Sequence, residues 1–201
     1  ADTFESATAS AAFGGTTTIV DHPGFGPDGC GLMHQIDLYH TLAEGKAVID
    51  YGFHGVLQRV DDGILNELEK LKEHGISSVK IYMTYSGKLS DDEILRVLER
   101  ARALGMLVAV HCENNDIVEH LKTEYIKQGK TGPEYHPLSR PPMAEAEAVN
   151  RVLSLGCTAG DAPLYLVHVS TGLSLEYIDF FRRGGYENFF VESCPQYLFL
   201  D

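Results

Sequence analysis

The 201-residue sequence predicts an α/β fold in which helices cover a parallel sheet. Short apolar runs alternate along the chain with amphipathic helical patterns. Most of the runs lack the polar alternation of a strand with one face in water, which is typical of strands covered on both faces. No polar linker interrupts the alternation, so we expect one domain whose helices form right-handed crossovers between neighbouring strands.

Six segments are expected to form the strands. They are rich in Val, Ile, Tyr and Phe, the residues that strands favour. Six strands suit either an open doubly wound sheet or an incomplete (β/α)₈ barrel, because a full barrel needs two more. In chain order the predicted strands are Thr16–Asp21, Val48–Val56, Ser78–Met83, Leu107–Glu113, Pro163–Ser170 and Phe189–Cys194.

Helical signals lie before, between and after these runs. Ser90 and Glu93 have capping-box spacing at the start of one helix. Gly75 and Gly105 each follow an apolar-periodic segment, where a helix commonly ends. Two irregular stretches, 23–32 and 129–142, are expected to be surface loops. The predicted helices are Thr3–Phe13, Met33–Glu44, Asp61–His74, Ser90–Leu104, one beginning near Asn115, Pro142–Leu155 and Thr171–Arg183.

Composition and charge narrow the function classes. The chain has 16 basic and 29 acidic residues, a net charge of −13, which argues against nucleic acid and anionic membranes as partners. No apolar run reaches the roughly 18 residues that span a bilayer. The four cysteines form no C-x-x-C pair, and no glycine-rich nucleotide motif follows a strand. We see no signal peptide and expect free thiols in a cytoplasmic protein.

Three predicted strands carry an ionisable residue near their C-terminal ends: Lys80, His111 and His168. Burying such groups is costly, and α/β proteins place their sites at these strand ends. A single strand histidine is more often a hydrogen-bonded core residue than a ligand. Two histidines at equivalent places in separate βα units favour shared metal ligation, because neutral imidazoles are good ligands for zinc and similar ions.

Lys80 and Tyr85 each allow more than one interpretation. Between Val79 and Ile81, a buried amine should have a lowered pKa. Lys80 then either extends its amine to the strand end, pairs with a carboxylate, or stays neutral and reacts with carbon dioxide. The resulting carbamate would be an anionic ligand able to bridge two metal ions. Tyr85 either packs within its loop or donates a hydrogen bond to a developing oxyanion.

These residues stand in motifs that resemble the dihydropyrimidinase/hydantoinase family of the amidohydrolase superfamily. A single motif is weak evidence, but seven motifs in the same order along the whole chain are specific. They are FGGTTTIVD (13–21), DYGFH (50–54), SVKIYMTY (78–85), VHCEN (110–114), TGPEYH with SRPP (131–142), VHVS (167–170) and ESCPQYL (192–198).

The resemblance implies a distorted, TIM-barrel-like (β/α)₈ fold with two divalent metal ions, usually zinc. Lys80 would be carboxylated and bridge the ions, His111 and His168 would ligate the second ion, and Tyr85 would polarise the scissile carbonyl. A metal-bridging hydroxide would open the C–N amide bond of a cyclic ureide or imide, of dihydropyrimidine or hydantoin type. The substrate would be a small molecule, and the protein a homotetramer.

By the same resemblance, residues 1–201 form a single partial barrel domain of about six βα units. We expect it to lack the first strand with its His-x-His pair, the eighth strand with its Asp, and a β-sandwich domain. Three of six expected ligands would remain, so the isolated chain should be inactive. His22 lies in a loop that differs from ordinary hydantoinases and either faces the site or makes a loop hydrogen bond. His54 is expected to be structural.

Two other functions compete. Allantoinase and dihydroorotase are related cyclic amidohydrolases, but Tyr85 and the 131–142 stretch favour the hydantoinase side. Non-catalytic scaffold relatives keep the fold and lose metal ligands, whereas Lys80, His111 and His168 are all present here. The sequence leaves open the natural substrate, its stereochemistry and the identity of the metal.

Overall fold

The computed structural model describes residues 2–199 and contains two parallel sheets that share one continuous segment of chain. β1 (Thr18–Asp21) pairs with β2 (Asp50–Phe53). His54 separates β2 from β3 (Gly55–Val56), which begins the second sheet, of order β3-β4-β5-β6-β7. The remaining strands are β4 (Ser78–Tyr82), β5 (Leu107–His111), β6 (Leu164–Leu166) and β7 (Phe189–Val191).

Three predicted strands need correction. The predicted strand Phe189–Cys194 ends at Val191. The predicted strand Val48–Val56 is divided, because β2 bonds only to β1 whereas β3 bonds only to β4. At His54 the chain passes from the two-stranded sheet to the five-stranded sheet. The predicted strand Pro163–Ser170 ends at Leu166. His168 has a φ of 42°, in the left-handed region, and this backbone cannot continue a strand.

The helices follow the predicted order. Ser90 and Glu93 form the expected capping box, and Gly105 ends the same helix with a φ of 65°. A four-residue helix, α6 (Tyr135–Leu138), lies within the stretch predicted to be a loop, and Pro195–Leu198 form a 3₁₀ turn. The predicted helices are α1 (Phe4–Phe13), α2 (Leu32–Ala43), α3 (Asp62–Glu73), α4 (Asp91–Leu104), α5 (Asn115–Lys127), α7 (Pro142–Thr158) and α8 (Gly172–Arg183).

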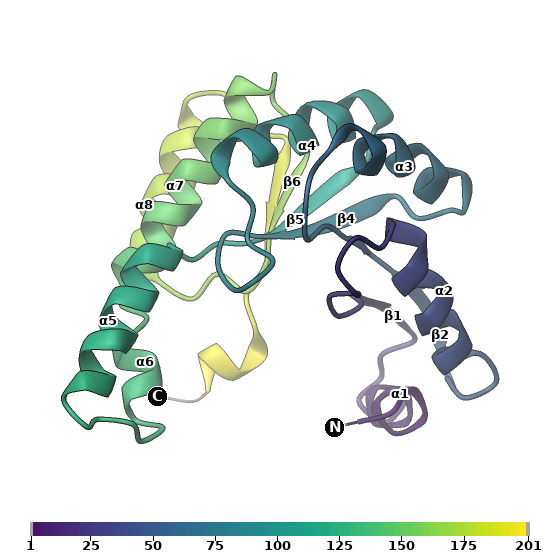
Figure 1. Cartoon of the computed structure of the whole chain (residues 1–201), viewed down its shortest axis with the longest axis horizontal. Coiled ribbons are helices and arrows are strands. Elements are labelled where there is room, and N and C mark those ends of the chain that lie inside the picture. The colour runs from purple at the N-terminus through teal and green to yellow at the C-terminus, as the bar shows by residue number, and fades with distance from the viewer. Residues whose placement is uncertain (1, 200–201) are drawn as a thin grey trace.

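The helices α2, α3, α4, α7 and α8 form a row of successive neighbours along one face of the sheets (Figure 1). Side chains alternate between the two faces of a strand. Val79 and Ile81 are fully buried in the core that the strands share with these helices, so Lys80 between them points to the opposite face. With helices along one face of a curved parallel sheet, the architecture is an incomplete barrel rather than a doubly wound sheet.

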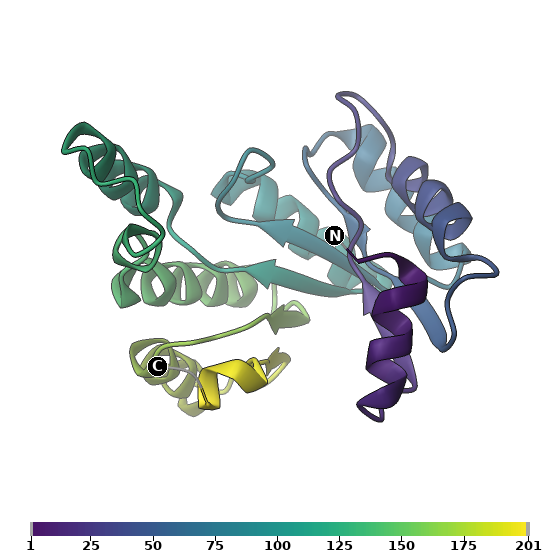
Figure 2. The same cartoon turned by 90° about the horizontal axis from the view of Figure 1, so that it is seen from below.

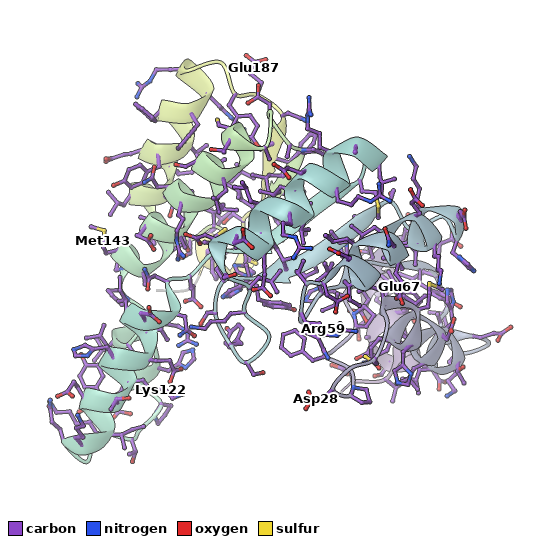
Figure 3. The ribbon with its side chains drawn as sticks, turned by 45° about the horizontal axis from the view of Figure 1, so that its top comes forward. Asp28, Arg59, Glu67, Lys122, Met143 and Glu187 are labelled. Atoms are coloured by element: carbon purple, nitrogen blue, oxygen red, sulfur yellow. The ribbon has the colours of Figure 1, made fainter. Side chains whose placement is uncertain are left out.

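Three further segments lie outside this row of helices. α1 lies below α2 in Figure 1, and α5 with α6 extends on the opposite side of the molecule (Figures 1 and 2). The loop 22–31 is held at its base, where Glu67 accepts a hydrogen bond from the backbone of Leu32 and Arg59 donates to the carbonyl of Gly29 (Figure 3). The four cysteines are free, and no described helix is both long and apolar enough to cross a membrane.

Candidate active site

A cavity of about 660 Å³ lies over the inner face of the sheet. The floor of the cavity is formed by β4 and β5, where Lys80 is paired with Ala109 and Tyr82 with His111. Paired residues of neighbouring strands point to the same face of a sheet, so all four side chains face the cavity. The side chains with polar atoms in its lining are His22, His54, Lys80, Tyr82, Tyr85, His111, Tyr165, His168, Glu192 and Cys194. The structure thus brings all four residues singled out in the sequence to one place.

Lys80 is buried, with 3% of its surface exposed. Its Nζ donates a long hydrogen bond of 3.3 Å to the carbonyl of Ile81 and lies 4.3 Å from the centre of the Tyr82 ring. Within residues 2–199 no carboxylate forms a salt bridge with it. Burial lowers the pKa of Lys80 to about 8, so roughly a tenth of the amine is neutral at pH 7. The alternatives of a solvent-reaching or carboxylate-paired lysine do not describe this side chain.

The two histidines face each other directly. Nδ1 of His111 lies 2.8 Å from Nε2 of His168. On its other side, Nε2 of His111 lies 2.7 Å from Oε2 of Glu113. Burial and the neighbouring His111 lower the pKa of His168, which favours neutral imidazole, the form that binds metals. The sequence did not single out Glu113, although it lies only two residues beyond His111.

The segment that follows His168 is held by one carboxylate. Glu145 of α7 accepts hydrogen bonds from the backbone amides of Ser170 and Thr171 and from the hydroxyl groups of Ser170 and Ser174. These contacts fix the turn between β6 and α8, in which His168 has its left-handed backbone. The position of His168 therefore depends on contacts with Glu145, whose partners Ser170 and Thr171 lie 25 and 26 residues further along the chain.

Tyr85 lies at the rim of the cavity. It has a φ of 72°, and 46% of its surface is exposed. Its ring centre lies 5.1 Å from that of His111. Its hydroxyl group makes no hydrogen bond with any described residue, and it is therefore available to a molecule in the cavity.

His22 and His54 line the same cavity, with ring centres 6.4 Å apart. His22 thus faces the site, the first of the two alternatives open for it. His54, expected to be structural, shares a 2.6 Å hydrogen bond between Nδ1 and the hydroxyl oxygen of Ser78 and also borders the cavity. Burial lowers the pKa of His54 to about 4 and, with the charge of Lys80, also lowers that of His22.

Glu192 was not singled out in the sequence. It follows β7 directly, and its carboxylate lies 3.4 Å from the backbone nitrogen of His168, which comes two residues after the end of β6. The sequence feature that could have identified Glu192 is its place near the end of a predicted strand. Glu192 lies within the motif ESCPQYL (192–198), but a carboxylate at that place is also compatible with a purely structural role.

The imidazole nitrogens of His111 and His168 are donor atoms of a type that binds divalent cations such as zinc. Nδ1 of His111 and Nε2 of His168 lie 2.8 Å apart, and a cation bound by both nitrogens would replace the hydrogen bond between them. No three His, Cys, Asp or Glu side chains within residues 2–199 form a metal site by themselves. Lys80 lines the same cavity as both histidines.

Comparisons with known proteins identify the family. The model of the "Amidohydrolase family" matches residues 1–162. A D-phenylhydantoinase of Escherichia coli O9:H4 (strain HS) is 50% identical over 200 residues, covering 100% of this chain and 43% of the relative. The chain therefore spans less than half the length of that relative.

Solved structures agree with this family. The crystal structure of a dihydropyrimidinase from Brevibacillus agri NCHU1002 superposes with a TM-score of 0.95 at 43% identity, over 100% of this chain and 43% of the other. An L-hydantoinase (dihydropyrimidinase) from Arthrobacter aurescens gives 0.84 at 30% identity, over 97% and 43%. These matches confirm the predicted TIM-barrel-like α/β class, here as an incomplete barrel, and the resemblance to hydantoinases. The chain belongs to the amidohydrolase family.

Proposed function

We propose that the protein containing this chain is a metal-dependent hydrolase that opens the C–N amide bond of cyclic ureides or imides. The observation that carries the proposal is the convergence of Lys80, His111, His168 and Tyr85 on one cavity. The names of the relatives, D-phenylhydantoinase and dihydropyrimidinase, support the substrate class. In the overall reaction water adds across the ring C–N bond: the carbon gains the hydroxyl group and the nitrogen gains the proton.

The metal centre would be held by His111 through Nδ1, by His168 through Nε2 and by Lys80 as its carbamate. Divalent cations, zinc by family resemblance, supply a water of lowered pKa and polarise the carbonyl group. The case for the carbamate is the lysine's own environment. A buried amine with a pKa of about 8 and no carboxylate partner within residues 2–199 is neutral often enough to attack carbon dioxide.

Tyr85 is proposed to donate a hydrogen bond to the carbonyl oxygen as negative charge develops on it. Its hydroxyl group has no partner among the described residues, and its ring lies against His111. A donor placed before the reaction begins stabilises the transition state without reorganisation. The left-handed backbone of Tyr85 is consistent with such a role, because strained conformations of non-glycine residues cluster at functional sites.

The proposal also includes zinc as the metal, a homotetrameric assembly and a cytoplasmic location, all by family resemblance. Metal analysis of the purified protein tests the first. Analytical ultracentrifugation tests the second, and any stable state other than a tetramer contradicts it. Fractionation of the source cells tests the third.

Ring-opening assays on the complete natural polypeptide test the activity and its subclass. Dihydrouracil and hydantoins should be hydrolysed, whereas activity on allantoin alone or on dihydroorotate alone would refute the hydantoinase assignment. A protein that binds no metal and opens none of these rings would be a non-catalytic scaffold.

A substitution tests the role of Lys80. Lys80→Ala should abolish binding of two metals, and added short carboxylic acids should restore activity by replacing the missing carbamate oxygens. Retention of two metals, without rescue by the acids, would eliminate the bridging role. Lys122→Ala is the matched control, because Lys122 is exposed on α5 and paired only with Glu119 among the described residues (Figure 3).

A further inference from the structure

A largely buried carboxylate, that of Glu113, lies behind His111 on the side away from His168 and is paired with Arg140. Oε2 of Glu113 lies 2.7 Å from Nε2 of His111, and their side chains are only 14% and 11% exposed. The other carboxylate oxygen, Oε1, lies 3.4 Å from Nε of Arg140, whose side chain is 20% exposed. Arg140 comes from the turn between α6 and α7, so the pair joins segments that are distant in sequence.

The chemistry of this arrangement fixes the tautomer of His111. An ionised carboxylate only accepts hydrogen bonds, so the proton of the neutral imidazole must lie on Nε2. The lone pair then lies on Nδ1, the atom that faces His168. Without Glu113, the proton is free to move to Nδ1, and the lone pair would point away from the cavity.

Two nitrogen atoms face the carboxylate of Glu113. Nε2 of His111 lies 2.7 Å from Oε2, and Nε of Arg140 lies 3.4 Å from Oε1. Arg140 also lies with its guanidinium carbon 5.9 Å from the centre of the Tyr85 ring. The same arginine therefore contacts both the carboxylate behind His111 and the tyrosine in front of it.

We propose that Glu113, oriented by Arg140, is a positioning residue that sets the tautomer and ring orientation of His111 for metal binding. The inference rests on the proposed role of His111 as a ligand. Carboxylates that accept from a ligating histidine raise its basicity, and their removal typically lowers metal affinity about 10- to 100-fold.

Two variants of Glu113 separate positioning from simple packing. Glu113→Gln keeps a neutral acceptor at the same place, and Glu113→Leu removes the acceptor. With ¹⁵N-histidine labelling of the metal-free complete polypeptide, His111 should be protonated on Nε2 in the parent protein. Its signal is identified by its loss in His111→Asn. The leucine variant should shift His111 towards Nδ1 protonation, and the glutamine variant should not.

Zinc affinity, measured by chelator competition, is the second readout. It should fall about 10- to 100-fold in Glu113→Leu and by less in Glu113→Gln. Glu147→Leu is the matched control, because the Glu147 carboxylate bonds to Asn114 and Arg151 and contacts no histidine. Its zinc affinity should stay within about twofold of the parent.

The outcomes distinguish a failure of the positioning role of Glu113 from a failure of the proposed metal-dependent function. An unchanged tautomer and an unchanged zinc affinity in Glu113→Leu would overturn the positioning role. If the parent protein bound no zinc, the proposed function would fail, while the tautomer in the metal-free protein would still report whether Glu113 orients His111. If Glu113→Leu does not fold, Glu113→Gln and Arg140→Met replace it in the test. Arg140→Met should also weaken zinc binding. An unchanged zinc affinity in Arg140→Met would contradict the role proposed for the Glu113–Arg140 pair.

Discussion

Replacing Lys80 by methionine should stabilise the metal-free protein while removing its proposed function. Methionine has a similar length and no charge. Burial depresses the pKa of Lys80 from 10.5 to about 8, so the folded state binds this proton less tightly than the unfolded state. Below pH 8 the amine is charged in both states, and the folded state bears the whole cost, about 3 kcal/mol. Above pH 10.5 the amine is neutral in both states and the cost disappears.

Denaturant unfolding in EDTA and CO₂-free buffer measures this effect. At pH 7, Lys80→Met should raise the free energy of unfolding by about 3 kcal/mol, and the gain should shrink as the pH rises from 8 to 10.5. Lys122→Met, an exposed control on α5, should change it by less than about 0.5 kcal/mol. A loss of stability in Lys80→Met, or a gain that is the same at pH 7 and pH 10.5, would refute the reasoning.

Three further predictions follow from the cavity. Tyr85→Phe should lower kcat about 10²- to 10³-fold without changing metal content, whereas a tyrosine that only packs in its loop would leave kcat unchanged. The pKa of His54 is about 4 in the folded state against 6.5 normally, so stability should fall as the pH drops from 6.5 towards 4. This loss should be about 2 kcal/mol after solvent screening, and a His54→Asn variant that unfolds with the same pH slope would contradict it. The 201-residue chain by itself should not open hydantoin rings measurably in a coupled or spectrophotometric assay, and turnover at the level of its relatives would disprove this.

Helix positions were predictable from the sequence because their signals are local. The capping box of Ser90 with Glu93 and the glycine at 105 act within a few residues, and the structure confirms both. α6 was missed because four residues are too few to show a helical period. Strand ends were less predictable, since a strand ends where its neighbour stops pairing. His54 marks a change of partner that no local pattern reveals.

The candidate site was predictable where a residue conflicts with its surroundings. Lys80 and His111 stand in apolar runs, and polar groups there carry a cost that a function can explain. Glu113 and Glu192 show no such conflict, because each lies beyond the apolar part of its strand. Their contacts with His111 and with the backbone of His168 became visible only in three dimensions.

The sequence by itself determined the α/β alternation, the family resemblance and the residue types able to bind metal ions, because these depend on composition and on order along the chain. Only the tertiary structure decided that β2 and β3 belong to separate sheets, that His22 and His54 share the cavity of Lys80, and that His111 is held between Glu113 and His168. The physical reason is that strand register and sheet curvature arise from pairing between distant segments. The same short runs of residues would satisfy local preferences in an open sheet or in a closed one.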